Sequence, residues 1–173
     1  MDYFEIEGKN KLFGDIDISG AKNAVLPLMA AAILNDRALT ITNVPKLSDS
    51  ITMGNLIKGM GGEVNFDHSS IIIDPKKLNI PYAPYKLVKT MRASFYVLGP
   101  LVARFGEAKV SLPGGCAWGP RPVDFHLEGL KKLGIDISLE AGYVIAKSKK
   151  IVGNKIVFPK ISVGATGNVL MAA

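Results

Sequence analysis

The sequence predicts an α/β repeat fold, an α+β arrangement of β-α-β-α-β-β units whose apolar helices lie inside a shell of strands. Helices rich in small apolar residues alternate with short strands of period-2 character. The same order of elements recurs after about 70 residues, which indicates an internal repeat. Neither a Gly-x-Gly-x-x-Gly motif nor a phosphate-binding P-loop motif occurs, so Rossmann and P-loop folds have no support.

The first unit is read from its hydrophobic pattern and its stop signals. A period-2 segment precedes an apolar helix, and a second strand ends at a proline. An amphipathic helix follows, and two glycines end it before a pair of strands. The expected ranges are a strand over 14–19, a helix over 24–34, a strand over 39–45, a helix over 49–60, and strands over 63–66 and 71–74.

The second unit repeats this order, and a third unit begins after it. The chain ends inside the leading helix of the third unit, on an apolar turn without a capping residue. Because such a surface needs a partner, we expect the sequence to be part of a longer protein. The expected ranges are a helix over 93–103, a strand over 108–113, a helix over 122–133 and strands over 135–139 and 143–147, then a strand over 155–158 and a helix over 161–173.

Composition limits the classes of function. The 173 residues carry a net charge of +6 from scattered lysines and arginines, a distribution that favours an anionic ligand or plain solubility over a nucleic-acid stripe. One cysteine excludes an internal disulfide and zinc sites built on cysteine pairs, and two separated histidines make a metal centre improbable. We expect no cofactor. The N-terminus does not have the pattern of a signal peptide and no apolar run reaches bilayer length, so we expect a cytoplasmic protein.

Polar or basic residues occupy the start of the leading helix in each unit. Lys22 and Asn23 open the first, Arg92 opens the second, and residues 162–166 open the third. Side-chain donors beside the free N–H groups and positive end of a helix can bind an anion. The alternatives are that Asn23 is an N-cap with Lys22 solvated, and that Arg92 forms a surface ion pair.

Residues 113–122 (Pro-Gly-Gly-Cys-Ala-Trp-Gly-Pro-Arg-Pro) form a glycine- and proline-rich loop. Cys116 in such a loop is expected to be accessible, and Arg121 can lower the pKa of its thiol. It could then act as nucleophile or general acid. The alternative is an inert, buried cysteine.

The helix after this loop opens with Arg121, Pro122 and Asp124. Arg121 and the free N–H groups can bind a diphosphate, and Asp124 can accept from a uracil N–H or simply complement the helix dipole. His126 is read as a packing histidine. His68 is read as a turn residue.

Several separate motifs resemble the UDP-N-acetylglucosamine 1-carboxyvinyltransferase (enolpyruvyl transferase) family. They lie in order along the whole chain at residues 19–23, 87–94, 98–106, 111–116 and 121–124. The resemblance implies an inside-out α/β barrel of three β-α-β-α-β-β units in each of two domains. It implies that residues 1–21 belong with the other domain and that residues 22–173 form the domain of the Cys loop, truncated within its third unit. Residues 117, 118 and 120 depart from the small or aliphatic residues expected there.

The resemblance also implies an activity and its residues. The family transfers enolpyruvyl from phosphoenolpyruvate to the 3′-hydroxyl of UDP-N-acetylglucosamine and releases phosphate, the first committed step of peptidoglycan synthesis. Cys116 would be the proton donor and the target of fosfomycin. The aspartate base and further arginines would lie beyond this chain, which would then be an inactive half-site. The substrate contacts implied are Lys22 (also catalytic), Asn23, Arg92, Arg121, Pro122, Val123, Asp124, Phe125, Lys160, Ile161, Ser162 and Val163.

Two rival readings remain. One is a sister enzyme of the 5-enolpyruvylshikimate-3-phosphate synthase type with the same fold, against which the Cys loop and the Arg-Pro-Val-Asp run at 121–124 argue. The other is a truncated, non-catalytic protein that binds a nucleotide sugar.

Overall fold

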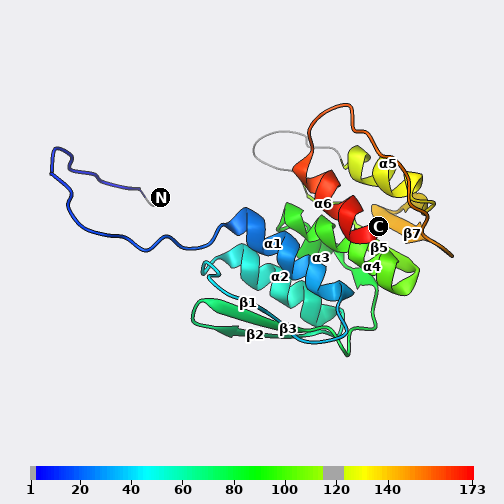
Figure 1. Ribbon diagram of the computed structural model, residues 1–173, viewed down its shortest axis with the longest axis horizontal. Coiled ribbons are helices and arrows are strands. Elements are labelled where there is room, and N and C mark those ends of the chain that lie inside the picture. Colours follow the sequence, from blue (N-terminus) through cyan, green and yellow to red (C-terminus); the bar gives the residue numbers. More distant parts are fainter. Residues whose placement is uncertain (1–2, 115–122) are drawn as a thin grey trace.

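The computed structural model describes residues 3–114 and 123–173. Two α/β halves lie next to each other, and residues 3–19 extend away from them as an arm without regular secondary structure (Figure 1). The first half contains α1 (Lys22–Ala31), η1 (Ala32–Leu34), β1 (Leu39–Ile41), α2 (Ser48–Gly59), β2 (Glu63–Asp67) and β3 (Ser70–Asp74). The second contains β4 (Tyr82–Ala83), α3 (Tyr85–Val88), η2 (Arg92–Val97), α4 (Leu98–Phe105), β5 (Glu107–Ser111), α5 (Asp124–Lys132), β6 (Asp136–Glu140) and β7 (Tyr143–Lys147), followed by α6 (Val163–Ala172).

The two halves share one topology, which confirms the predicted repeat. In the first, β3 lies between β1 and β2, and both pairings are antiparallel. In the second, β7 lies between β5 and β6 with the same senses. The helix before each hairpin ends in a glycine turn, where Gly61 and Gly134 adopt positive φ. The predicted α/β repeat of helices and strands is therefore correct; the first sheet is antiparallel and the second is mixed.

The second sheet has a strand that the sequence did not predict. β4 pairs in parallel with β5, with Tyr82 opposite Lys109 and Ala83 opposite Val110. The two residues lie between Pro81 and Pro84, and prolines at these positions indicate a turn. A strand of two residues is also too short to show a period-2 pattern. The four-residue helix α3 was missed for the same reason of length.

Two predicted strands are wrong. Residues 14–19 alternate in polarity but lie in the exposed arm, and residues 155–158 run along the surface without strand hydrogen bonds. A strand needs a neighbour to satisfy its backbone groups, and neither segment has one within 3–114 and 123–173. In the second sheet, β4 lies at the outer edge of β5. In the first sheet, no strand of the described part of the chain occupies the corresponding place at the outer edge of β1.

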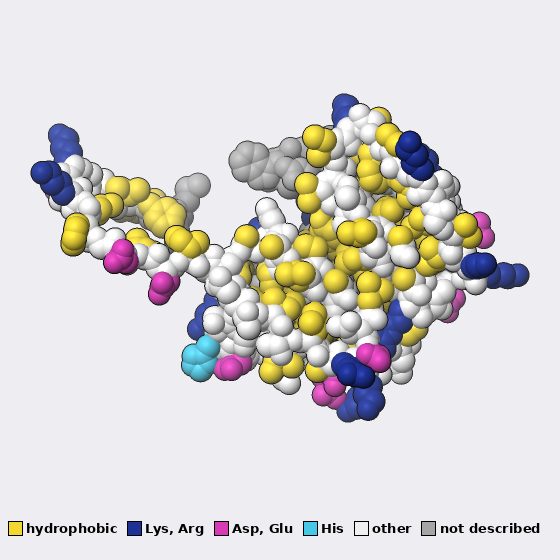
Figure 2. Space-filling view, in the orientation of Figure 1, with side chains coloured by type: hydrophobic (Ala, Val, Ile, Leu, Met, Phe, Trp, Pro, Cys, Tyr) yellow, Lys and Arg dark blue, Asp and Glu magenta, His cyan; other side chains and the backbone are white. Residues whose placement is uncertain are grey.

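The core is built around α4, which packs against α6 and η1. Five consecutive residues of α4, Leu98–Val102, are buried, as predicted for a helix that is apolar on all sides. The expectation is only partly correct for α1 and α6, because Leu28 is 50 % exposed and Leu170 is 74 % exposed. Figure 2 shows hydrophobic side chains gathered over this helical face, which no described segment covers.

One arginine joins the two halves. The guanidinium of Arg104, in the last turn of α4, donates to the backbone carbonyls of Ile33 at 2.6 Å, Asn35 at 2.8 Å and Pro75 at 3.1 Å. These carbonyls lie within η1, directly after η1 and directly after β3, so a single planar side chain satisfies acceptors on two segments of the first half. The contact fixes α4, and the η2 segment before it, relative to α1.

Candidate functional site

A cavity of about 760 Å³ opens where α1, η2, the start of α5 and the start of α6 meet. The elements come from all three predicted units, so the repeat brings its leading helices to one place. The lining residues are Asn23, Leu26, Pro27, Arg92, Ala93, Phe95, Tyr96, Val123, Asp124, Phe125, His126, Lys160, Ile161, Ser162, Val163 and Gly164.

Most of the residues singled out from the sequence meet in this cavity. Asn23 and Arg92 lie on separate helices, and the rest come from the segments 123–125 and 160–163. Cys116, Arg121 and Pro122 lie outside the described residues. Val123, the next residue in the sequence, is buried and lines the cavity.

The starts of three helices face the cavity, and their backbone groups add to its polarity. Asn23 is the second residue of α1, whose N-cap is Ala21, so the alternative that Asn23 caps this helix is wrong. Arg92 is the first residue of η2. Ser162 is the N-cap of α6, and its Oγ accepts from the N–H of Ala165 at 3.2 Å. The N–H groups of these first turns have no helical partner and favour an anion.

Lys22 does not line the cavity, although its neighbour Asn23 does. Its ammonium lies 3.2 Å from the carboxylate of Asp49 in the first turn of α2, and both side chains are partly exposed. An exposed pair of this kind contributes little to stability and can be exchanged for another anion. Lys22 is therefore next to a residue of the cavity wall, and its ammonium group is available to an anionic ligand that replaces Asp49.

The cavity has more positive than negative side chains. Among the described residues that line it, the positive ones are Arg92 and Lys160, and the acidic one is Asp124 in the first turn of α5. Apolar side chains complete the wall, and the rings of Phe125 and Phe158 stack with centroids 6.0 Å apart. A wall with two cations, helix N-termini and an aromatic side suits a phosphorylated ligand that also has an apolar or planar part.

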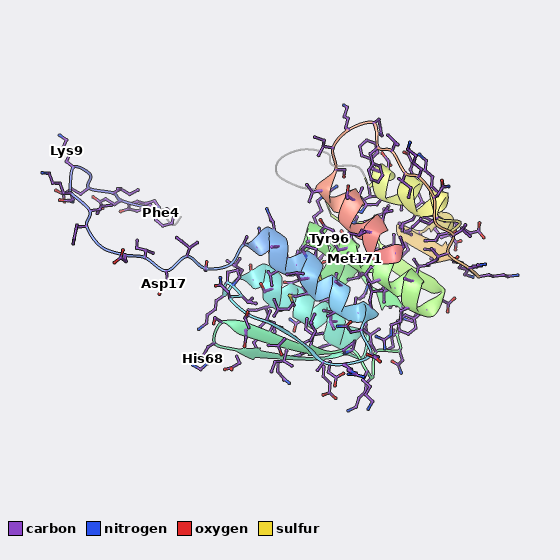
Figure 3. All side chains as sticks on the ribbon, in the orientation of Figure 1. Phe4, Lys9, Asp17, His68, Tyr96 and Met171 are labelled. Carbon is purple, nitrogen blue, oxygen red and sulfur yellow. The ribbon has the colours of Figure 1, made fainter. Side chains whose placement is uncertain are left out.

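Two polar residues of the wall, His126 and Tyr96, were not predicted as part of the site from the sequence. The imidazole of His126 packs edge-on against Phe95 at 5.3 Å and Tyr96 at 6.5 Å between ring centroids. Burial, and then the charge of Arg92, lower the pKa of His126 to about 4, so the ring is neutral at neutral pH. Burial also raises the pKa of Tyr96. Figure 3 shows Tyr96 between α1 and α6.

The packing interpretation of His126 was thus incomplete, because the ring is both packed and part of the cavity. A sequence signal for this existed in Asn168, a polar residue in the middle of the apolar helix α6. Asn168 is fully buried and contacts His126. His68, by contrast, lies in the β2–β3 turn, as predicted, and adopts a positive φ. It lies far from Tyr96 of the cavity wall (Figure 3).

The described residues contain neither a candidate metal site nor a candidate membrane-spanning helix. Across residues 3–114 and 123–173, no three His, Cys, Asp or Glu side chains come together as a metal site would require. Over the same ranges, none of the helices has the length and apolar character needed to cross a bilayer.

Comparisons with known proteins agree with this fold. A UDP-N-acetylglucosamine 1-carboxyvinyltransferase from Acinetobacter guillouiae is 53% identical over 174 residues, which cover 100% of this chain and 42% of that protein. The protein of the same name from Koribacter versatilis is 52% identical over 177 residues, which cover 100% of this chain and 41% of that protein. The chain therefore spans less than half the length of the curated relatives it matches.

Solved structures and a family model complete the comparison. The enolpyruvyl transferase NikO from Streptomyces tendae has a TM-score of 0.71 at 24% identity, covering 84% of this chain and 32% of that one. An EPSP synthase from Acinetobacter baumannii has a TM-score of 0.71 at 16% identity, covering 92% and 37%. At these identities the structures show a shared fold alone. The family model described as EPSP synthase (3-phosphoshikimate 1-carboxyvinyltransferase) matches residues 6–173, and the chain belongs to this family.

Proposed function

We propose that this chain provides one side of the active site of an enzyme that transfers enolpyruvyl from phosphoenolpyruvate to the 3′-hydroxyl of UDP-N-acetylglucosamine. The observation that carries the proposal is the cavity, in which nine of the residues expected to contact these substrates come together from three units of the repeat. The names of the 53% identical relatives support the choice of substrate.

The nucleotide sugar occupies the side of the cavity formed by α5 and α6. Asp124 accepts from the N–H of the uracil, and the ring of Phe125 with Val123 covers the apolar part of the uridine. Lys160 and the first turn of α6 neutralise the diphosphate. Arg92 lies between the two substrates.

Phosphoenolpyruvate is held near the start of α1, by Lys22 and Asn23. Its carboxylate and phosphate draw Lys22 from its exposed pair with Asp49. Cys116 then supplies the proton that C3 receives while the sugar hydroxyl oxygen bonds to C2 and a base takes the hydroxyl proton. The Cys116 thiolate then takes a proton back from C3 while phosphate leaves C2, which regenerates the double bond and gives enolpyruvyl-UDP-N-acetylglucosamine. Arg121 neutralises the diphosphate of the nucleotide sugar.

The same assignment makes Cys116 the target of fosfomycin. Thiolate attack on the epoxide opens the ring and leaves a thioether, with the proton passing to the alkoxide. Cys116→Ser is expected to keep nucleotide-sugar binding and to abolish alkylation, which mass spectrometry detects. Unchanged labelling of the variant would remove Cys116 from its role.

The remainder of the site, including the base for the sugar hydroxyl, comes from protein beyond this chain. The arm at residues 3–19 supports a second domain, because its apolar side chains, such as Phe4 and Ile16, are exposed. Figure 3 shows Phe4 on this arm, away from the body of the protein. Gly20 meets the body of the protein, where its N–H donates to Asn43 Oδ1 at 3.0 Å. We therefore assign residues 1–21 to the other domain and 22–173 to the Cys-loop domain of an inside-out α/β barrel. The enzyme would act in the cytoplasm, in cell-wall synthesis.

Calorimetric binding tests the assignment of the cavity. UDP-N-acetylglucosamine is expected to bind the chain, and Lys160→Ala is expected to weaken binding by about tenfold or more, because one charge-assisted hydrogen bond is lost. Lys155→Ala is the matched control, since Lys155 is exposed and outside the cavity lining. Equal effects of the two substitutions would contradict the assignment. Preference for shikimate 3-phosphate would instead favour the sister enzyme.

A further inference from the structure

The imidazole of His126 is connected to the interior of the protein by one nitrogen and faces the cavity with the other. The residue is the third of α5, and its ring is partly buried between η2 and α6. Nδ1 lies 3.0 Å from Nδ2 of Asn168. Which of the two nitrogens carries the proton follows from the bonds of Asn168.

The amide of Asn168 has only one possible orientation. The backbone N–H of Gly99 donates to Oδ1 of Asn168 at 2.7 Å, which places the oxygen. Nδ2 then donates one hydrogen to the carbonyl of Phe95 at 3.1 Å. Its second hydrogen points at Nδ1 of His126, so Nδ1 is the acceptor. In the neutral ring the proton must therefore be on Nε2.

Nε2 is directed towards the first turn of α6. A Cβ at Gly164 would lie 3.1 Å from Nε2, so the glycine leaves space beside this nitrogen that a side chain would crowd. Within the described parts of the chain, no acceptor within hydrogen-bonding distance of Nε2 is found. The nearest backbone groups are donors, the free N–H groups that start α6, and the hydroxyl of Tyr96, which can donate or accept, lies 3.8 Å from the same point at Gly164.

The charged side chains of the same wall are Arg92 on η2, Lys160 before α6 and Asp124 on α5. The summed charge of these three side chains is positive. A nitrogen that can only donate, surrounded by other donors and cations, matches an oxygen that carries negative charge. A neutral ring also adds a donor without adding the repulsion that a third cation would give to the arginine and the lysine.

We propose that Nε2–H of His126 donates a hydrogen bond to an anionic phosphate oxygen of the bound substrate, and that Asn168 is the positioning residue that holds the imidazole in this tautomer. The identity of the phosphorylated ligand depends on the function proposed above, whereas the donor geometry does not. The phosphate belongs either to the diphosphate of the nucleotide sugar or to phosphoenolpyruvate, since both bring the same oxygen chemistry to the cavity.

The bond has a spectroscopic consequence. An anion that accepts from Nε2–H favours the protonated ring, so binding must raise the pKa of His126 from its low value near 4. The chain contains only two histidines, His68 and His126. His68 is exposed in the β2–β3 turn and serves as the internal control in every spectrum. Imidazole resonances are assigned by His68→Gln and followed by NMR against pH.

Four probes separate the sources of phosphate: UDP-N-acetylglucosamine, phosphoenolpyruvate, inorganic pyrophosphate and uridine. We expect the pKa of His126 to rise with at least one phosphorylated probe and to stay unchanged with uridine, while the resonances of His68 shift with none of the probes. The probe that shifts His126 identifies the phosphate. If no phosphorylated probe shifts His126, or if uridine shifts it equally, the proposal is wrong.

Variants distinguish a ligand contact from a structural role. His126→Asn keeps a polar group at the level of Nδ1 but cannot reach the cavity, and is expected to weaken binding of the active probe about tenfold or more. His126→Gln places an amide nitrogen near the position of Nε2 and is expected to recover most of this loss. Equal losses of binding affinity in the two variants, accompanied by equal losses in the free energy of unfolding, would show that His126 has a purely structural role.

The outcomes also separate this proposal from the proposed function. Binding of UDP-N-acetylglucosamine without a change at His126 overturns the histidine contact and leaves the function standing. A shift of His126 by pyrophosphate, with no binding of UDP-N-acetylglucosamine, supports the histidine contact and removes the proposed substrate.

Discussion

Replacement of Asn168 by leucine tests how the central helices are held together. The side chain of Asn168 is fully buried and stands between the carbonyl of Phe95 and the N–H of Gly99. In a continuous α-helix these two groups would bond to each other, because they are four residues apart. Asn168 bridges them where η2 passes into α4, so an inserted side chain accounts for the change of helix type.

The magnitude follows from the groups left without a partner. Leucine has the same branched arrangement of heavy atoms, in a somewhat larger volume, and cannot form hydrogen bonds, so Asn168→Leu removes all three bonds. Phe95 keeps one partner, because its carbonyl also accepts from the N–H of Leu98. The N–H of Gly99 and Nδ1 of His126 lose theirs. At about 1–3 kcal/mol for each unsatisfied buried group, the free energy of unfolding should fall by about 4 kcal/mol.

Urea denaturation followed by circular dichroism measures this loss. Asn55→Leu is the matched control, since Asn55 lies in α2 and is exposed. It should change the free energy of unfolding by no more than about 0.5 kcal/mol. A loss below about 1 kcal/mol for Asn168→Leu, or one equal to that of the control, would refute the bridging role, because the helix would then have closed its own bond.

Two further perturbations test the same region. The pKa of His126 is lowered from 6.5 to about 4 in the folded state, so the stability it contributes is complete above pH 6.5 and is lost as the pH falls towards 4. The free energy of unfolding lost over this pH range is about 3 kcal/mol, and His126→Gln should lack this part of the pH dependence in denaturation experiments. The same dependence of the free energy of unfolding on pH in both proteins would contradict a neutral His126 ring. Gly99→Ala would place Cβ 2.2 Å from the carbonyl oxygen of Asn168. Thermal unfolding should therefore show a loss of about 3 kcal/mol or more, against no change for Gly8→Ala, whose surroundings are open.

The repeat and most helices could be predicted because local signals agree with the tertiary fold. The glycines at 61 and 134 end helices at positive φ, and each is followed by a hairpin as expected. Strand β4 could not be predicted, because its two residues between prolines are strand only by virtue of β5. Residues 14–19 and 155–158 show the converse, since alternation alone makes no strand without a neighbour.

The candidate site was predicted less evenly. Polar residues at the starts of successive leading helices indicated a shared anion site, and Asn23, Arg92 and Ser162 do line one cavity. His126 was not predicted as part of it, since a single histidine on an amphipathic helix carries no signal of its own. Its role depends on Asn168, 42 residues away in the sequence, and only the packing of α5 on α6 brings the two together.

The most direct test of the proposed activity is turnover by a completed enzyme. The chain would replace the corresponding 42% of the relative from Acinetobacter guillouiae, with which it shares 53% identity. Phosphate release from phosphoenolpyruvate would then be measured with and without UDP-N-acetylglucosamine. We expect release that requires the nucleotide sugar, within about tenfold of the parent kcat/KM. A correctly folded chimera that binds UDP-N-acetylglucosamine but releases no phosphate, or one that turns over shikimate 3-phosphate instead, would contradict the assignment.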